Sequence, residues 1–304
     1  MRAVWSLWTK PFEARHEIVW PSREHHLFSW ALSFHTARRH FARTALVTDD
    51  EGARLLVDRL GLPFDEVSTE LNALAGHDPG WWALGKVYAY RAQTEPFIHI
   101  DSDVFLWEPL PGSVTSAPVF AQCPEYFTPG TSYYKPALFE RHLSEGGALW
   151  LPAEWVWYRS SGLAQRAESC GIFGGNRVDF IRHYAEQAIR LVEHPDNRAG
   201  LATLPDKFEH NILFEQYLLA ACLVYHGRRA GSPYRGVEIR YLFDSIDEAF
   251  YSDQTGYTHL IASAKRNQDV ARRLERRVRR DYPEYYERCV RPAAGRAQAP
   301  ASVG

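Results

Sequence analysis

Short apolar runs alternate with longer amphipathic segments in the first third of the chain. Uninterrupted apolar runs are typical of buried strands, whereas apolar residues at positions i, i+3, i+4 and i+7 indicate a helix with one buried face. Strands and helices that alternate in this way favour a mostly parallel central sheet with helices on both faces, so we expect an α/β fold. The strands predicted here cover residues 3–8, 44–48, 66–71 and 97–100, and the helices cover residues 27–41, 49–60 and 82–93.

The regular alternation is lost after Pro109. We expect one domain over residues 1–291, with a first half at 1–108, a second half at 109–265 and a basic helix at 266–291. Residues 292–304 are mostly Ala, Pro, Gly and Arg, and we expect them to be disordered. After Pro109 the predicted strands cover residues 118–123, 169–176 and 257–261. The predicted helices cover residues 178–193, 209–226 and 266–280, and the last of these is an Arg-rich helix that we expect to be solvated. Loops rich in Trp and Tyr are predicted at residues 128–134 and 150–159.

Capping and turn residues mark several of these boundaries. Thr9 begins a predicted polar loop after the first strand, as is common in nucleotide-binding α/β domains. Asp49 or Asp50 can cap the second helix, which Gly61 ends. Asn176 can cap the helix at 178–193.

Composition excludes some classes of protein. The chain has 304 residues, 45% of them hydrophobic and 24% charged, with a net charge of -2, which argues against a nucleic-acid partner. The four cysteines are far apart and form no Cys-x-x-Cys pair, so we expect reduced thiols in a cytoplasmic protein. No signal peptide is visible, and no run approaches the roughly 18 apolar residues that a membrane span needs, so we expect solubility.

Asp101, Ser102 and Asp103 follow the predicted strand at 97–100 and form the main candidate site. Side chains alternate faces in an extended chain, so the two carboxylates point the same way and can bind one cation. Mg²⁺ and Mn²⁺ favour such oxygen ligands and retain free positions for phosphate oxygens. The alternative is a turn in which either carboxylate accepts hydrogen bonds from nearby backbone amides.

The predicted strand at 169–176 is rich in small residues, among them Gly171, Gly174 and Gly175. Glycines within a strand allow close approach of a ligand or of another backbone segment. Tight packing alone is the alternative explanation for this pattern.

The order of several motifs resembles retaining nucleotide-sugar glycosyltransferases of the GT-A fold, most closely the glycogenin-like and bacterial galactosyltransferase-like family, glycosyltransferase family 8. The resemblance spans roughly residues 1–266, with Cys170 where that family usually has Asn, and Ala262 and Arg266 where it usually has Gly and Pro. The motifs that carry it are Lys86 ahead of the Asp-Ser-Asp strand, the small-residue strand at 169–176, the Glu215-Gln216 pair at a later helix, and His259 followed six residues later by Lys265.

The resemblance implies a metal-dependent transfer of a hexose from a UDP- or GDP-sugar, with UDP-hexose as the expected donor, to an acceptor hydroxyl with retention. The acceptor would be a carbohydrate, a peptide or a small molecule. It implies Mn²⁺ or Mg²⁺ as the cofactor. The implied site residues are Asp101, Asp103 and His259 as metal ligands, Trp8, Thr9, Lys86, Ser102 and Lys265 as donor-binding residues, and Glu215, Gln216 and Lys265 as catalytic residues.

Two other functions fit the same sequence. A nucleotidyltransferase uses a similar fold and metal, but it commonly has a Gly-rich basic loop after the first strand, and residues 6–12 contain no glycine. A non-catalytic carbohydrate-binding protein would use the abundant tryptophans as a binding surface. Trp150, Trp155, Trp157 and Tyr158 are expected either to line an acceptor site or to pack between the two halves.

Overall fold

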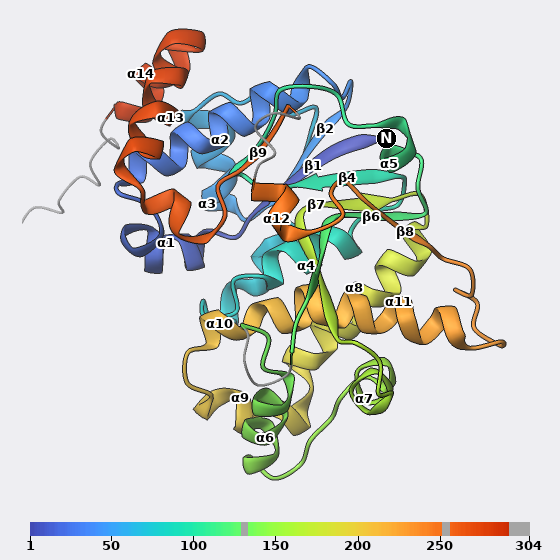
Figure 1. The fold of residues 1–304 in the computed structure, drawn as a ribbon. Helices are drawn as coiled ribbons and strands as arrows, with labels where there is room; N and C mark the ends of the chain where they lie inside the picture. The colour runs from blue at the N-terminus through green and yellow to red at the C-terminus, as the bar shows by residue number, and fades with distance from the viewer. Residues whose placement is uncertain (129–132, 251–255, 292–304) are drawn as a thin grey trace, which may run out of the picture.

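The computed structural model describes residues 1–128, 133–250 and 256–291, and a seven-stranded sheet forms the centre of this part (Figure 1). The strand order is β3-β2-β1-β4-β7-β6-β8. The strands are β1 (Arg2–Leu7), β2 (Thr44–Thr48), β3 (Glu66–Ser68), β4 (Phe97–Ile100), β6 (Val119–Tyr126), β7 (Arg166–Gly175) and β8 (Ile239–Tyr241).

Strand direction divides the sheet into a parallel part and a mixed part. Strands β3, β2, β1 and β4 are parallel neighbours, so their carboxyl ends share one edge. Strand β7 is antiparallel to both β4 and β6, and β8 is parallel to β6. The expected α/β fold with a mostly parallel sheet is therefore confirmed.

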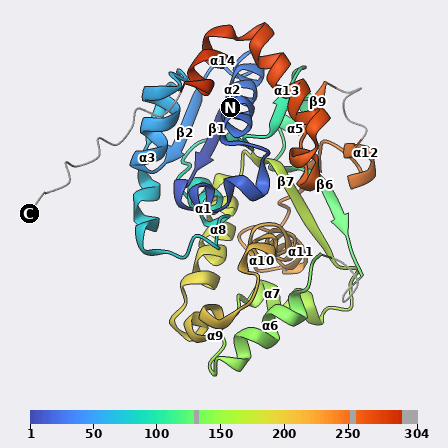
Figure 2. The same cartoon turned by 90° about the vertical axis from the view of Figure 1, so that its left-hand side faces the viewer.

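Two hydrophobic cores cover the two faces of the sheet. Helices α2 (Arg23–Arg38), α13 (Gln268–Asp281) and α14 (Pro283–Val290) contribute to one core. Helices α4 (Leu84–Arg91), α8 (Val178–Glu193) and α11 (Leu218–Arg228) contribute to the other, and Figure 2 shows α8 and α11 below strands β1 and β2. The remaining helical segments are α1 (Thr9–Val19), α3 (Asp50–Ala53), α5 (Gly112–Thr115), α6 (Pro136–Glu145), α7 (Ala153–Ser160), α9 (Arg198–Thr203), α10 (Lys207–Ile212), α12 (Ile246–Phe250), the π-helical η1 (Arg54–Arg59) and η4 (Leu213–Tyr217), and the 3-10 helices η2 (Glu70–Gly76), η3 (Pro195–Asn197) and η6 (Ala262–Arg266).

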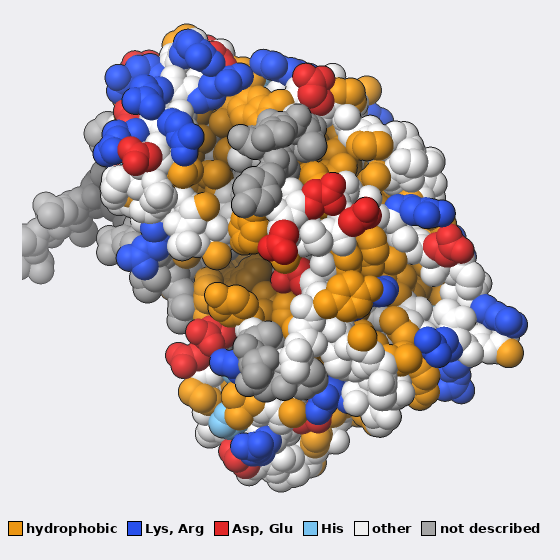
Figure 3. Space-filling view, in the orientation of Figure 1, with side chains coloured by type: hydrophobic (Ala, Val, Ile, Leu, Met, Phe, Trp, Pro, Cys, Tyr) orange, Lys and Arg blue, Asp and Glu red, His pale blue; other side chains and the backbone are white. Residues whose placement is uncertain are grey.

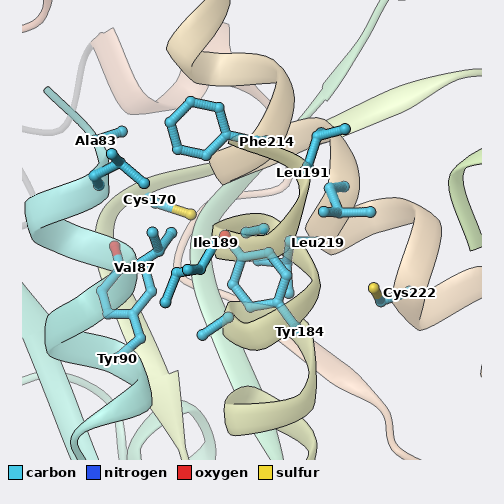
Figure 4. Close-up of a cluster of buried hydrophobic side chains, with 14 of the residues drawn as sticks. Ala83, Val87, Tyr90, Cys170, Tyr184, Ile189, Leu191, Phe214, Leu219 and Cys222 are labelled. Atoms are coloured by element: carbon cyan, nitrogen blue, oxygen red, sulfur yellow. The ribbon is translucent and has the colours of Figure 1, made fainter. Parts of the chain in front are cut away.

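Close packing between α4 and α8 is visible in Figure 4, where Val87 and Tyr90 of α4 lie near Tyr184 and Ile189 of α8. All four side chains are nearly or fully buried. Cys170 and Cys222 belong to the same core, and all four cysteines of the chain are free and buried, which agrees with the expected reduced thiols.

A second, two-stranded sheet pairs β5 (Val104–Leu106) with β9 (Tyr257–His259) in antiparallel register. Strand β5 begins directly after Asp103, and Val104 lies opposite His259. This pairing joins two segments that are about 150 residues apart in sequence. It brings His259 next to the Asp-Ser-Asp segment.

Several predicted elements are confirmed by the structure. Strands β2 and β4 and helix α8 have the predicted bounds, and the chain is extended where β9 was expected. Asp49 caps α3 by accepting a hydrogen bond from the backbone amide of Gly52. Gly61, with φ of 70°, ends the following helical segment, as the sequence indicated.

Other predictions are wrong. The loop predicted at residues 9–11 is instead the first turn of helix α1, where a helix tolerates Pro11. Residues 153–160 form helix α7, whose aromatic side chains Trp155 and Tyr158 are buried in the core. Asn176 does not cap α8, since its side-chain amide donates instead to the carbonyl oxygen of Ser116.

Two further predictions are correct only in part. The third strand ends at Ser68, and residues 70–76 continue as the 3-10 helix η2. The Arg-rich helix α13 is not solvated on all sides, because Ala271, Leu274 and Val278 are buried. The predicted disordered tail at 292–304 and part of the predicted loop at 128–134 lie outside the described residues.

Candidate functional site

The Asp101-Ser102-Asp103 segment follows β4 at the edge where the parallel strands end. Two serines of helix α2 hold its backbone from one side. The hydroxyl group of Ser29 donates to the carbonyl oxygen of Ser102 at 2.6 Å, and that of Ser33 donates to the carbonyl oxygen of Asp101 at 3.1 Å. The segment is thus fixed by its main chain, which leaves both carboxylates free for other contacts.

Asp101, Asp103 and His259 form a candidate metal group, since one possible ligand atom from each lies within 4.8 Å of the others. His259 Nε2 is 3.5 Å from Asp103 Oδ1. Among the residues that the structure describes, neither carboxylate accepts a hydrogen bond from a backbone amide. The expected extended geometry is nevertheless wrong, because the Val104 amide donates to the Asp101 carbonyl oxygen at 3.0 Å and residues 101–104 form a turn. The carboxylates themselves do not stabilise this turn through backbone amides, so they remain candidates for other ligands.

The orientation of the His259 imidazole suits a metal ligand. Its Nδ1 lies 2.7 Å from Oε1 of Gln122, which also accepts a hydrogen bond from the hydroxyl group of Tyr257 at 2.7 Å. A carbonyl oxygen only accepts, so Nδ1 carries a proton, and Nε2 is the ring nitrogen that faces Asp103 and would bind a metal ion. Such a partner for the second ring nitrogen is the usual companion of a metal-bound histidine.

Gly171 of β7 provides the space that this arrangement needs. A Cβ atom at this position would lie 2.3 Å from Gln122 Oε1 and 2.4 Å from His259 Nδ1. The close approach expected for the small-residue strand therefore includes two side chains. Gly174 and Gly175 of the same strand instead approach neighbouring backbone, at Phe97 and Pro118.

Two lysines neutralise part of the acidic charge. Lys86 Nζ lies 2.9 Å from Asp101 Oδ1 and 2.5 Å from Glu215 Oε1. Lys265 forms an ion pair with Asp103. Glu215 has no exposed side-chain surface, so it contacts Lys86 from within the core.

Burial and neighbouring charges shift the titration of these groups in opposite directions. Burial raises the pKa of Asp101 and of Glu215 above their ordinary values, although Lys86 opposes this in both cases. Burial acts in the same sense on Asp103, but Lys265 and His259 outweigh it and hold the pKa of Asp103 below its ordinary value. Burial disfavours the charged form of Lys86, yet Asp101 and Glu215 raise its pKa. The charged form is therefore favoured at Asp103 and disfavoured at Asp101 and Glu215.

A cavity of about 250 Å³ lies beside this cluster. Lys86, Asp101, Ser102, Asp103 and Lys265, all predicted site residues, line it. Its remaining wall is largely aromatic and includes Trp8, also predicted, together with Phe12, Trp20, Trp30, Trp82 and Phe208.

Four predicted site residues lie outside the cavity lining. His259 reaches the cluster through Asp103, and Glu215 reaches it through Lys86. Thr9 donates from its backbone amide and its hydroxyl group to Asp49 Oδ2, at 2.8 Å in both cases. The side-chain oxygen of Gln216 accepts a hydrogen bond from the Tyr134 hydroxyl group at 2.6 Å. Their own side chains thus engage protein partners.

The structure adds two residues that sequence reasoning did not select, Gln122 and His99. His99 lines the cavity, its Nε2 is 2.9 Å from the Ser6 hydroxyl oxygen, and its Nδ1 is 3.6 Å from Asp101 Oδ1. Burial and Lys86 keep the pKa of His99 well below its ordinary value, so the ring is neutral. The i, i+2 spacing of His99, in β4, and Asp101, directly after it, was a usable signal, because side chains two positions apart in an extended chain share a face.

Lys and Arg side chains gather on a different part of the surface. Figure 3 shows them at the upper left, over the position of α13 and α14 in Figure 1. No helix among the described residues has both the length and the apolar character needed to cross a bilayer.

Fold and site together define an α/β protein with a buried cluster of carboxylates, imidazoles and lysines beside an aromatic cavity at the carboxyl ends of parallel strands. A protein-family model matches residues 1–292, so the chain belongs to DUF6734, a family of unknown function. No curated protein matches the chain.

Proposed function

We propose that this chain is a metal-dependent glycosyltransferase of the GT-A type, which moves a hexose from a nucleotide sugar to an acceptor hydroxyl group. The main support is the convergence of Asp101, Asp103 and His259 beside Lys265, next to an aromatic cavity. A nucleoside diphosphate leaving group needs its developing charge neutralised by a cation and a basic side chain. The cluster offers ligands for a cation, and Lys265 supplies the basic side chain.

The charge balance of the cluster favours a bound cation. Within residues 1–128, 133–250 and 256–291, Asp101, Asp103 and Glu215 pair with two ammonium groups, those of Lys86 and Lys265. Asp101, Asp103 and Nε2 of His259 would hold Mn²⁺ or Mg²⁺, which would polarise the diphosphate when bound. Carboxylate-rich ligand sets suit these hard ions.

Lys265 is assigned the main role in the chemical step. Its ammonium group contacts Asp103 and lines the cavity, so it can exchange a carboxylate partner for diphosphate oxygens. A charge that gains importance as the sugar–phosphate bond breaks lowers the barrier more than it strengthens donor binding. We therefore expect the loss of Lys265 to affect turnover first.

Lys86 and Glu215 are assigned positioning roles. Lys86 connects the buried Glu215 with Asp101 and so fixes the orientation of the first carboxylate. The family resemblance implies a catalytic role for Gln216 and a donor-binding role for Thr9, and either side chain would reach a substrate only after leaving its partner, Tyr134 or Asp49. The aromatic lining, including Trp8 and Trp82, offers faces for a base or a sugar ring.

The backbone at Ala262 also supports the family resemblance. Ala262 has φ of 48°, in the left-handed region that favours glycine, and the related enzymes usually have glycine at the matching position. The chain thus keeps the turn between His259 and Lys265 although the residue differs. UDP-hexose as the donor and retention of configuration remain parts of the proposal that rest on the resemblance.

The nucleotidyltransferase alternative has less support. Helix α1 begins at Thr9, only two residues after β1, so no glycine-rich loop separates them. A binding protein without turnover would not need the Lys265 ammonium group beside Asp103. The products separate the three functions: a transferase releases UDP or GDP, a nucleotidyltransferase releases pyrophosphate, and a binding protein releases neither.

The test is a thermal-shift panel of UDP- and GDP-sugars with and without Mn²⁺, followed by nucleotide-release assays on the active donor. A ligand at about 100 times its dissociation constant stabilises the folded state by about 2.7 kcal/mol, which raises the melting temperature by several degrees. Donor hydrolysis is a sufficient readout, because it needs no known acceptor.

Two variants assign the roles within the site. We expect Lys265→Ala to lower the release rate on the order of 100-fold with little change in donor affinity. We expect His259→Ala to weaken Mn²⁺ binding and to be partly rescued by excess Mn²⁺. Lys207→Ala is the matched control, because Lys207 also pairs with an aspartate and has a similar side-chain exposure, 19% against 23%. Parental release rates in both site variants would refute the proposal.

A further inference from the structure

A second cluster of possible metal ligands lies between three helices in the second half of the chain. Glu154 belongs to α7, His183 to α8 and His226 to α11. The cluster shares no residue with the site around Asp101, and the three helices lie below the central sheet in Figure 1. Nothing in the proposed glycosyltransferase reaction requires it.

The three ligand atoms form a compact triangle. His183 Nε2 is 2.8 Å from Glu154 Oε1, His226 Nε2 is 3.2 Å from the same oxygen, and the two Nε2 atoms are 3.2 Å apart. Zinc bonds of about 2.0–2.1 Å in a tetrahedron separate neighbouring ligand atoms by about 3.3 Å. The triangle therefore has nearly the size of one face of a zinc tetrahedron.

From this geometry we propose that Glu154, His183 and His226 bind one Zn²⁺ ion. Two imidazoles and one carboxylate are a familiar protein ligand set for zinc, with water in the fourth position. Hard ions such as Mg²⁺ prefer oxygen ligands, so they fit this set less well than they fit the Asp101 cluster. The ion would tie α7 to α8 and α11.

Neighbouring groups hold the two imidazoles in place. The Ser232 hydroxyl oxygen lies 2.8 Å from His226 Nδ1, and the same oxygen accepts a hydrogen bond from the backbone amide of Tyr234. The Tyr234 ring lies 5.0 Å from the His183 ring and 5.1 Å from the His226 ring, between ring centroids. Such outer contacts fix the direction of ligand nitrogens before a metal arrives.

The site is mostly enclosed but has one accessible side. The side chains of Glu154 and His226 are 7% and 10% exposed, whereas that of His183 is 23% exposed. An ion can therefore reach the triangle past His183, and a water molecule can complete the coordination there. This inference is independent of the proposed function.

A metal-free network of hydrogen bonds is the competing explanation. In that case at least one imidazole would donate from Nε2 to the carboxylate oxygen, and the second Nε2 would either donate to the same oxygen or accept from the first across 3.2 Å. With zinc, both nitrogens are deprotonated and direct lone pairs at the ion. The two explanations predict different responses to zinc and to chelators.

The experiment measures zinc directly in the full chain carrying Asp103→Asn, which removes a ligand from the other candidate metal group. After incubation with Zn²⁺ and desalting, we expect one zinc per chain by elemental analysis, and no retained Mg²⁺ under the same conditions. EDTA should lower the melting temperature by several degrees, and Zn²⁺ should restore it. Co²⁺ in place of Zn²⁺ should give the intense visible absorption of a tetrahedral site.

Variants in the same background locate the ion. His183→Ala with His226→Ala should abolish zinc retention and the effect of EDTA, and Glu154→Gln, which preserves the shape of the side chain, should weaken retention at least 10-fold. His77→Ala is the matched control, because His77 pairs with Glu193 of α8 at 27% exposure and belongs to neither candidate metal group among the described residues. It should retain one zinc per chain.

The first result that would overturn the proposal requires only that the Asp103→Asn chain folds, and it does not depend on the histidine variants. If the Asp103→Asn chain retains no zinc and its melting temperature does not respond to EDTA, the triangle is a metal-free network. Equal zinc retention in the folded double-histidine variant would also overturn it. Glu154→Gln provides a second test, since it keeps both imidazoles and removes only the negative charge of the carboxylate.

Discussion

Gly171 is the residue on which the direction of the His259 imidazole depends most closely. We expect Gly171→Ala to push the ring and the Gln122 amide apart, because a Cβ atom would lie about 2.4 Å or less from both. Displacing an outer partner of a ligand typically costs 10–100-fold in metal affinity. Overpacking of a buried site typically destabilises by about 1–3 kcal/mol. Mn²⁺ titration by calorimetry and urea unfolding measure the two effects.

Gly227→Ala is the control for this substitution. Gly227 lies in α11, and a Cβ atom there would meet nothing within 4 Å. Alanine should stabilise that helix by about 0.5–1 kcal/mol and leave Mn²⁺ binding unchanged. An unaltered Mn²⁺ affinity in folded Gly171→Ala would show that His259 does not bind the metal.

Individual site residues were predictable to different degrees. Asp101 and Asp103 could be selected from their place directly after a buried strand, although the chain forms a turn there rather than the extended segment that the prediction assumed. The contact between Lys86 and Glu215 joins positions 129 apart in sequence, and no local pattern encodes such a pair. Gln122 could not be selected for the same reason, since its role comes from contacts between its side chain in β6 and Tyr257 and His259 in β9.

At the scale of elements, prediction succeeded where the hydrophobic pattern was strong and failed where aromatic residues dominated. Helix α8 has clear apolar periodicity and both its ends were predicted. Helix α7 contains Trp155, Trp157 and Tyr158 within eight residues, a composition that suggested a loop with binding functions. Burial of Trp155 and Tyr158 against the other core helices decides its structure, and that is a tertiary effect.

Lys86 connects α4 with the end of β4 through its ion pair with Asp101. Replacing Lys86 should therefore change how the stability of the fold depends on pH. Lys86→Met keeps most of the volume but leaves Asp101 and Glu215 without their shared cation. Breaking a buried ion pair from one side typically costs about 3–5 kcal/mol. We expect a loss of that size at neutral pH, measured by urea unfolding.

The loss should become smaller as the pH falls. Both carboxyl groups already have a raised pKa in the folded protein, and without Lys86 burial would raise it further. A group whose folded pKa lies above its unfolded pKa destabilises the fold as the pH rises above the unfolded pKa, which is 3.8 for Asp and 4.5 for Glu. The difference from the parent should therefore grow between about pH 4.5 and neutrality. Lys207→Met, at an exposed pair, is the control, and a loss independent of pH would show that packing rather than charge is responsible.

At the scale of the whole molecule, one sheet connects the two halves that the sequence suggested. Strand β4 has β1 of the first half on one side and β7 of the second half on the other. The contact with β7 is close, because a Cβ atom on Gly174 would lie 2.0 Å from the carbonyl oxygen of Phe97. The candidate site spans the same junction, with Asp103 from one half and His259 from the other.

This shared sheet predicts a single cooperative unfolding transition. Seven of the ten tryptophans precede residue 109, so tryptophan fluorescence reports mainly on the first half, whereas far-UV circular dichroism reports on helices of both. We expect the two signals to give the same urea midpoint, because neither half can lose its strands without exposing the buried edge of β4 or β7. A chain cut to residues 1–108 should accordingly not fold, since fully buried Phe97 and Ile98 would lose the neighbouring strand. Two separate midpoints, or a folded 1–108 fragment, would mean that the halves are independent and that the site forms only when they meet.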